Sequence, residues 1–386
     1  MADVVIAGIG QTPVGEHWDI GLRDLALTAI REAVEDCGGL RPEALFVGNM
    51  LAPNLSNQAH LGALLADYAG LGGIEAVTVE ASGASGGAAI RQGYLAIASG
   101  MIDVALVVGV EKFTDRVGPD VEAAVSTTSD SDFEAVQGLT PTAQAALLMR
   151  RYFHEFNVPP AAFAGFAVTA HANGAGNPNA MYRKPIKVDT YTQSPTVNPP
   201  LNQYDIAPNA DGAAALILTR REFLHGSSQH PVVRIAASAS AADTLALHDR
   251  KDILDFECCG ISTARVLKHA GMTIGDIDFF EYHDSYSIYA ALALESAGLA
   301  ERGTGWKLAA EGAISLQGRI PTATMGGLKA RGFPGGATGV YQAAEATLQL
   351  QGRAGKNQLD RANRALIQSV GGPASTVVSH ILEKAA

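Results

Sequence analysis

The sequence predicts an α/β protein made of two similar halves, with a long segment inserted before the first half ends. Short apolar runs rich in Val, Ile and Ala alternate with longer stretches of helical periodicity. The order of strands and helices restarts near residue 232, and each half contains a helix that opens on glycines. At 386 residues, the chain exceeds the length at which one hydrophobic core usually stops growing. These observations favour an internal duplication with helices on both faces of each sheet.

The elements of the first half each have their own signal. A helical pattern over 21–37 closes on two glycines. The stretch VEASGASGGAAIRQGYLAIASG, residues 79–100, predicts a strand that runs into a glycine-rich turn and then a helix of small residues. Apolar runs of the kind that form buried strands occupy four further places. These are Val4–Ala7, Ala44–Val47, Asp103–Gly109 and Asp211–Leu218.

The second half repeats this pattern. Gly335–Leu350 has the same glycine-opened helical signal as residues 85–99. Strands are predicted at Val232–Ser238, Ile277–Glu281, Arg364–Gln368 and Ser375–Leu382, and helices at 261–271 and 289–298. The predicted domains are a first half over 1–111 and 211–230, an inserted loop or lid region over 112–210, and a second half over 231–386. The insertion carries a helical pattern over 141–156.

Composition narrows the class of protein. The formal net charge of −11 argues against nucleic acid or an anionic membrane as the main partner. No apolar run approaches the ~20 residues of a membrane span, and the first residues lack a secretory signal pattern. Three cysteines, two of them adjacent, suit reduced thiols, so we expect a cytoplasmic protein. The sequence contains no zinc-ligand spacing and no phosphate-binding loop, so we expect no metal and no bound cofactor.

Several motifs together resemble the thiolase superfamily, in particular its sterol-carrier, lipid-transfer and archaeal type. They are the two glycine-opened helices, HDSYS before a helix, GGLKARGFPGGATGVYQ, NPNAMYRKPI and YDIAPNADGAAA. The match follows nearly the whole chain in order. The resemblance implies a duplicated five-layered α/β/α/β/α thiolase fold with an inserted loop region. It also implies acyl-CoA thioester substrates and a homodimer.

The sequence departs from that family at the nucleophile. The family motif reads Val-Glu-Ala-Ala-Cys-Ala-Ser-Gly, whereas this chain has Gly83 at the position of the cysteine. An acyl-enzyme needs a nucleophilic side chain, which glycine lacks. Ser82 is one position away, and no base that would activate it is evident. We expect Gly83 to leave space for a bulky acyl group and Ser82 to line that substrate pocket.

Two further family motifs are also altered. Gly-His-Pro is replaced by Gly332-Phe333-Pro334, so the histidine that activates the cysteine is missing and an aromatic ring reshapes the pocket. The proton-shuttling cysteine near the C-terminus is absent, although Gly371 and Gly372 remain. The adjacent cysteines in DFECCGIS fit no family motif, and we interpret them as buried small apolar residues.

Part of an acid–base set survives in EYHDSYS, after a predicted strand. The resemblance places His283 and Asp284 at a motif that faces the substrate. Tyr286 is a further candidate, because a phenol can donate to an oxyanion, or act as a base when its pKa is lowered. The alternative for each residue is a structural role in the core.

Backbone and cationic groups complete the predicted site. The amide of Gly83, together with an amide of the Gly371-Gly372 turn, is expected to form an oxyanion hole. Positive charge for the phosphates of coenzyme A is expected from the inserted segment and from the residues just before Gly332-Phe333-Pro334. The candidate CoA-binding residues are Arg183, Lys184, Lys187, Lys329 and Arg331.

Together, the motifs favour carbon–carbon bond chemistry on an acyl-CoA without an acyl-enzyme. Retro-aldol cleavage of a β-hydroxyacyl-CoA needs only a base at the hydroxyl and stabilisation of the enolate that leaves. The chain is similar to nucleophile-less aldolases of steroid side chains, a resemblance that also implies a separately encoded partner with an OB fold and a zinc ribbon. Two alternatives remain open: a thiolase or acetyl-CoA acyltransferase of the lipid-transfer type, and a non-catalytic acyl-CoA-binding subunit of a complex.

Overall fold

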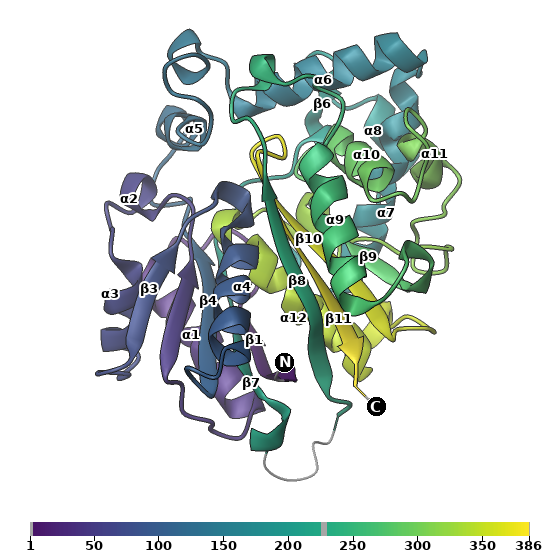
Figure 1. Cartoon of the computed structure of the whole chain (residues 1–386). Helices are drawn as coiled ribbons and strands as arrows, with labels where there is room; N and C mark the ends of the chain where they lie inside the picture. Colours follow the sequence, from purple (N-terminus) through teal and green to yellow (C-terminus); the bar gives the residue numbers. More distant parts are fainter. Residues whose placement is uncertain (1–2, 225–229, 386) are drawn as a thin grey trace.

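The computed structural model describes residues 3–224 and 230–385 and contains one nine-stranded sheet that runs through both halves (Figure 1). The halves meet where β1 pairs with β8 in antiparallel fashion, at Val5 and Ile6. From edge to edge the strands are β3 (Glu75–Val79), β2 (Ala44–Gly48), β4 (Val104–Glu111), β7 (Gly212–Arg220), β1 (Val4–Gln11), β8 (Val233–Ala242), β11 (Thr376–Lys384), β10 (Arg364–Gly371) and β9 (Phe279–Glu281).

Two glycine-opened helices form the inner layer of the molecule. These helices, α4 (Ser85–Ala98) and α12 (Thr338–Gln351), pack on each other and contact strands of both halves. On the outside, α1 (Leu22–Asp36) and α3 (Leu61–Tyr68) pack on strands of the first half, and α9 (Glu257–Ala270) packs on β8 and β11 (Figure 1). The predicted α/β class is confirmed. The structure differs from the expected two separate sheets in one respect, because β1 and β8 pair edge to edge and join them into one sheet.

Small residues let the inner helices approach closely. A Cβ on Gly86 would lie 2.8 Å from the carbonyl oxygen of Gly336, and one on Gly339 would lie 2.2 Å from the amide nitrogen of Gly87. Side chains do not tolerate such distances, so the glycines permit the contact. This close packing fixes the relative position of the two turns that precede the helices, η1 (Ser82–Ala84) and η9 (Gly335–Ala337).

The predicted strands and helices coincide with elements of the structure, with one notable shift. In the stretch over 79–100, only Val79 belongs to a strand, and Ser82–Ala84 form a 3₁₀ turn. The inserted region adds α5 (Pro119–Ser126), α6 (Pro141–Phe156), α7 (Ala164–Gly174), α8 (Val188–Thr192) and the strands β5 (Thr196–Asn198) and β6 (Leu201–Asn202). Further helices are α2 (Ala52–Leu55), α10 (Ser287–Ser296) and α11 (Gly305–Ala310). Among the described residues, no helix has the length and apolar character of a membrane span.

Candidate active site

A cavity of about 100 Å³, here called the small cavity, lies where segments from both halves converge. The turn η1 borders it, as do the segments that follow β9 and β10. These two strands are parallel neighbours, so their carboxyl ends lie at the same edge of the sheet. Six residues singled out in the sequence line the small cavity: Ser82, Gly83, His283, Tyr286, Phe333 and Gly372.

His283 faces Gly83 across this cavity. A Cβ built on Gly83 would lie 3.1 Å from Cε1 and 3.5 Å from Nε2 of the imidazole. The ring of Phe333 meets that imidazole edge-on, with centroids 5.5 Å apart. Burial, assisted by the positive charge of Arg331, lowers the pKa of His283 to about 3. At neutral pH the imidazole is therefore uncharged, and its ring has a lone pair that can accept a hydrogen bond.

The backbone beside Gly83 closes the space that a side chain would occupy. A Cβ at this position would lie 2.7 Å from the carbonyl oxygen of Val370, which is fixed in β10. The expectation that Gly83 leaves room for a bulky acyl group is therefore wrong. The carbonyl oxygen and the imidazole of His283 already fill that volume.

Tyr286 stands at the N-terminal end of α10, and its hydroxyl is 3.1 Å from Oγ1 of Thr142 on α6. Burial raises the pKa of Tyr286 to about 12, and the Thr142 hydrogen bond only partly offsets this effect. The lowered pKa that a phenolate base requires is not present. Tyr286 is thus a protonated phenol, suited to donating a hydrogen bond or a proton.

Ser82 has a left-handed backbone, with φ of 52°, and its hydroxyl points toward the sulfur of Met50 at 3.7 Å. This contact supplies no base, so the geometry gives no support to Ser82 as a nucleophile. Gly372, with φ of 57°, lines the small cavity. Gly371 packs instead against the 79–84 turn, because a Cβ there would lie 2.4 Å from the carbonyl oxygen of Ala81.

Asp284 is fully buried and is not part of the cavity lining. Its Oδ1 accepts a hydrogen bond of 2.7 Å from the amide of Leu328. Burial raises the pKa of Asp284, and the nearby Lys329 opposes that rise. The carboxyl group therefore holds the turn at residues 327–331, which is a positioning role rather than the substrate contact expected from the motif.

A second cavity of about 960 Å³, here called the large cavity, adjoins the small one. Ile206 and Ala207 line both cavities, so the two share a wall. Arg183 and Lys184 line the large cavity from the inserted region and are exposed to solvent. A volume of this size accommodates a ligand much larger than an acyl chain.

Aromatic rings form another part of the large cavity. His171 stacks on Tyr182, with centroids 5.9 Å apart, and meets Tyr204 edge-on at 5.5 Å. Lys329 also lines this cavity, but its ammonium group donates to the carbonyl oxygens of Asp205 at 2.8 Å and Tyr204 at 3.3 Å. Burial lowers the pKa of Lys329 to about 8. The ammonium group of Lys329 therefore already has hydrogen-bond partners within the protein.

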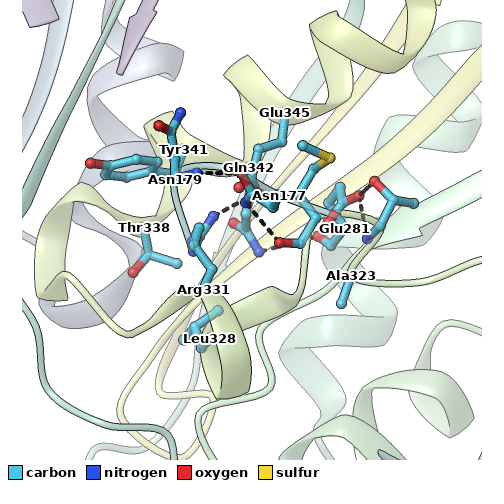
Figure 2. A network of polar contacts seen from close by, with 12 residues as sticks. Asn177, Asn179, Glu281, Ala323, Leu328, Arg331, Thr338, Tyr341, Gln342 and Glu345 are labelled. Carbon is cyan, nitrogen blue, oxygen red and sulfur yellow. Dashed lines mark hydrogen bonds and ion pairs between the residues drawn. The ribbon is translucent and has the colours of Figure 1, made fainter. Parts of the chain in front are cut away.

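The other two candidate CoA-binding cations lie elsewhere. Lys187 is exposed at the start of α8 and is outside the lining of both cavities. Arg331 is completely buried and pairs with Glu345 at 2.6 Å, within a polar network that includes Gln342 (Figure 2). The guanidinium also lies over the ring of Tyr341, at 5.0 Å from its centroid. The prediction that Arg331 binds CoA is wrong, because this side chain serves the core.

Some cavity residues had no signal in the sequence. Glu122, Val125, Thr142 and Tyr289 line the small cavity, and the first three come from the inserted region. Their roles depend on how α5 and α6 fold back over the sheet, which no local pattern reveals. Tyr289 lies three positions after Tyr286, at the start of the helix predicted over 289–298, and that spacing is the one clue to its location.

Comparison with known proteins gives the family. The thiolase N-terminal domain matches residues 4–222, and a thiolase C-terminal domain-like family matches residues 239–384. The chain belongs to the thiolase superfamily. It is 40% identical to an acetyl-CoA acetyltransferase of Methanothermobacter thermautotrophicus, over 100% of both chains.

Other thiolase relatives differ in their named activities. A 17-hydroxy-3-oxo-4-pregnene-20-carboxyl-CoA lyase of Mycobacterium tuberculosis is 28% identical, over 90% of this chain and 91% of that protein. The solved structure of an Ltp2-ChsH2(DUF35) aldolase superimposes with a TM-score of 0.85 at 24% identity and covers 99% of this chain and 98% of its own. The fold thus includes proteins named as transferases and as lyases, so the choice between them depends on the site.

Proposed function

We propose that this protein cleaves a carbon–carbon bond of a β-hydroxyacyl-CoA by a retro-aldol route. The observation that carries the proposal is a cavity with a neutral imidazole and a protonated phenol but no thiol. Cys258 and Cys259 are buried in α9, where burial raises the pKa of both thiols, and Cys37 follows α1. Among residues 3–224 and 230–385, no cysteine lines either cavity.

The substrate is proposed to occupy both cavities. The large cavity would hold the nucleotide and pantetheine portions, with Arg183 and Lys184 near the phosphates. The thioester would pass the shared wall at Ile206 and Ala207 and place the acyl chain in the small cavity. This arrangement would bring the β-carbon close to His283 and Tyr286, which line that cavity.

In the proposed reaction, Nε2 of His283 accepts the proton of the β-hydroxyl group. The electron pair of the O–H bond forms the new carbonyl, the Cα–Cβ bond breaks, and its electrons move into the thioester as an enolate. Backbone amides at Gly83 and Gly372 would stabilise the enolate oxygen. Protonation of Cα, for which Tyr286 is the proposed donor, completes the reaction and gives an acyl-CoA and a free aldehyde or ketone.

Product analysis tests this proposal. The purified protein is offered β-hydroxyacyl-CoA and β-ketoacyl-CoA esters, each with and without free CoA. We expect the β-hydroxy ester to be cleaved at the same rate whether or not free CoA is added. Cleavage of the β-keto ester alone, and only with free CoA, would instead identify a thiolase.

An acyltransferase of the thiolase type is the second candidate. The 40% identity with an acetyl-CoA acetyltransferase, over the full length of both chains, favours it. The closed space at Gly83 and the absence of a thiol beside His283 argue against an acyl-enzyme. A covalent acyl group found on the protein during turnover would favour this candidate.

A partner protein is a further element of the proposal. The aldolase of similar fold has a second component, ChsH2(DUF35), in its name, and a relative of Thauera aromatica with 27% identity is named as a subunit of benzoylsuccinyl-CoA thiolase. We therefore include a separately produced DUF35-type partner in the assays. If this chain cleaves the ester only when the partner is added, the chain is one subunit of the active enzyme.

The two exposed cations of the large cavity provide a binding prediction. Changing both Arg183 and Lys184 to alanine is expected to raise the Kd for CoA roughly tenfold, because two charges near the phosphates are lost. Isothermal titration calorimetry measures the change, and increasing salt should reduce the difference between the variants. Lys187→Ala is the matched control, since this lysine is exposed but lies outside the cavity. Equal Kd values for the double variant and the control would contradict the placement of CoA.

A further inference from the structure

The walls of the small cavity limit the size of what it can hold. Its volume of about 100 Å³ compares with roughly 300 Å³ for the smallest pockets that enclose drug-sized molecules. A water molecule in the liquid occupies roughly 30 Å³, so the small cavity has room for roughly three or four non-hydrogen atoms. A steroid ring system does not fit in that volume.

The inner end of the small cavity is part of the hydrophobic core. Tyr289 is 3% exposed, and its ring packs edge-on against Tyr286 at 5.0 Å and against Phe256 at 5.3 Å. Side chains in such a core are close-packed, so this wall does not yield to a longer chain. Another part of the lining comes from α5, where Val125 is half-buried.

The charge on the residues that line the small cavity is negative. Among the described residues that line the small cavity, Glu122 is the one with a charged side chain, because the imidazole of His283 is neutral. Glu122 also acts electrostatically on Tyr286, whose pKa it helps to raise. Within residues 3–224 and 230–385, no lysine or arginine lines this cavity to pair with a negatively charged acyl group. Glu122 is exposed to solvent on α5, so a carboxylate brought beside it would meet like charge that water partly screens.

We propose that the acyl portion of the substrate is short and uncharged, and that Val125 and Glu122 on α5 determine this selectivity. Val125 limits the length of the chain, and Glu122 excludes a terminal carboxylate. This inference rests on the proposed function, since it assumes that a CoA ester places its acyl chain in the small cavity. It names the substrate class as esters with at most about four acyl carbons.

Calorimetric binding of free CoA, butanoyl-CoA, octanoyl-CoA and succinyl-CoA tests the inference without requiring turnover. We expect butanoyl-CoA to bind at least tenfold more tightly than either octanoyl-CoA or succinyl-CoA. Val125→Ala should lower the ratio of the Kd for octanoyl-CoA to the Kd for butanoyl-CoA at least threefold. Glu122→Gln should lower the corresponding ratio for succinyl-CoA at least fivefold. The controls are Val121→Ala and Asp120→Asn, which make the same changes on α5 at positions outside the cavity lining.

The outcomes separate this inference from the proposed function. If free CoA binds but octanoyl-CoA binds as tightly as butanoyl-CoA, the proposed selectivity for short acyl chains is contradicted, whereas the proposed CoA site is not. Equal effects of the cavity variants and their controls also contradict the selectivity. If neither free CoA nor any ester binds, the proposed function fails and the inference fails with it.

Discussion

Replacing His283 by alanine is expected to reduce the rate of β-hydroxyacyl-CoA cleavage by a factor of 10² to 10⁴. Loss of a general base typically has an effect of roughly this size. Burial and the charge of Arg331 hold this imidazole neutral, with its pKa at about 3. The Kd for butanoyl-CoA should change much less than the rate, because the side chain acts on the reacting atoms.

The pH dependence gives a second readout for His283. An ordinary histidine has a pKa near 6.5, so a base of that kind loses activity as the pH falls below about 6.5. Because the pKa of His283 is lowered, the imidazole stays unprotonated, and cleavage is expected to continue with little loss down to about pH 5. His269→Ala is the control, since His269 is exposed near the end of α9. A His283→Ala variant that retains half of the wild-type rate would exclude this residue as the base.

Gly83→Ala is the second substitution for which we expect a large effect. The new Cβ would lie 2.7 Å from the backbone oxygen of Val370 and 3.1 Å from Cε1 of His283. Because the first contact is with backbone, relief requires movement of β10 or of the 82–84 turn. We expect cleavage to fall at least tenfold and the free energy of unfolding to fall by about 1–3 kcal/mol, as measured by chemical denaturation.

Gly83→Cys distinguishes a closed site from a simple loss of the nucleophile. The same short contacts oppose a cysteine, so we expect no gain of CoA-dependent cleavage of β-ketoacyl-CoA. Gly72→Ala is the control, because a Cβ at that glycine has no neighbour within 4 Å. If Gly83→Cys acquires thiolase activity and a covalent acyl group, the site is an intact thiolase site that lacks only its thiol.

Local sequence patterns predicted much of the fold. The continuous apolar runs of β4 and β7 identify strands that are buried along almost their whole length. The glycines that open α4 and α12 indicated the duplication, and the structure shows why they are needed, since the helices touch at Gly86 and Gly339. The pairing of β1 with β8 was not predictable, because it depends on how two halves meet rather than on either half alone.

The candidate site could be predicted only in part. Motifs close in sequence to a strand end or a helix start, such as those of Gly83, His283 and Tyr286, were brought together as expected. Arg331 was misassigned because GLKARG looks like a solvent-exposed basic segment, whereas its partner Glu345 is one helix further along the chain. Glu122 was not identified because its place in the cavity depends on a long-range fold of the inserted region.

The position of the β-carbon after cleavage tests the central claim most directly. A β-hydroxyacyl-CoA labelled with ¹³C at the β-carbon is incubated with the protein and excess free CoA, and the products are followed by ¹³C NMR. We expect the label to appear in a free aldehyde or ketone, with the original CoA retained on the unlabelled fragment. A β-ketoacyl-CoA labelled at the same carbon is incubated in parallel with free CoA. If the β-hydroxy ester is not cleaved and the label of the β-keto ester appears in a new CoA thioester, the acyl group has passed through a nucleophile, which would contradict cleavage without an acyl-enzyme.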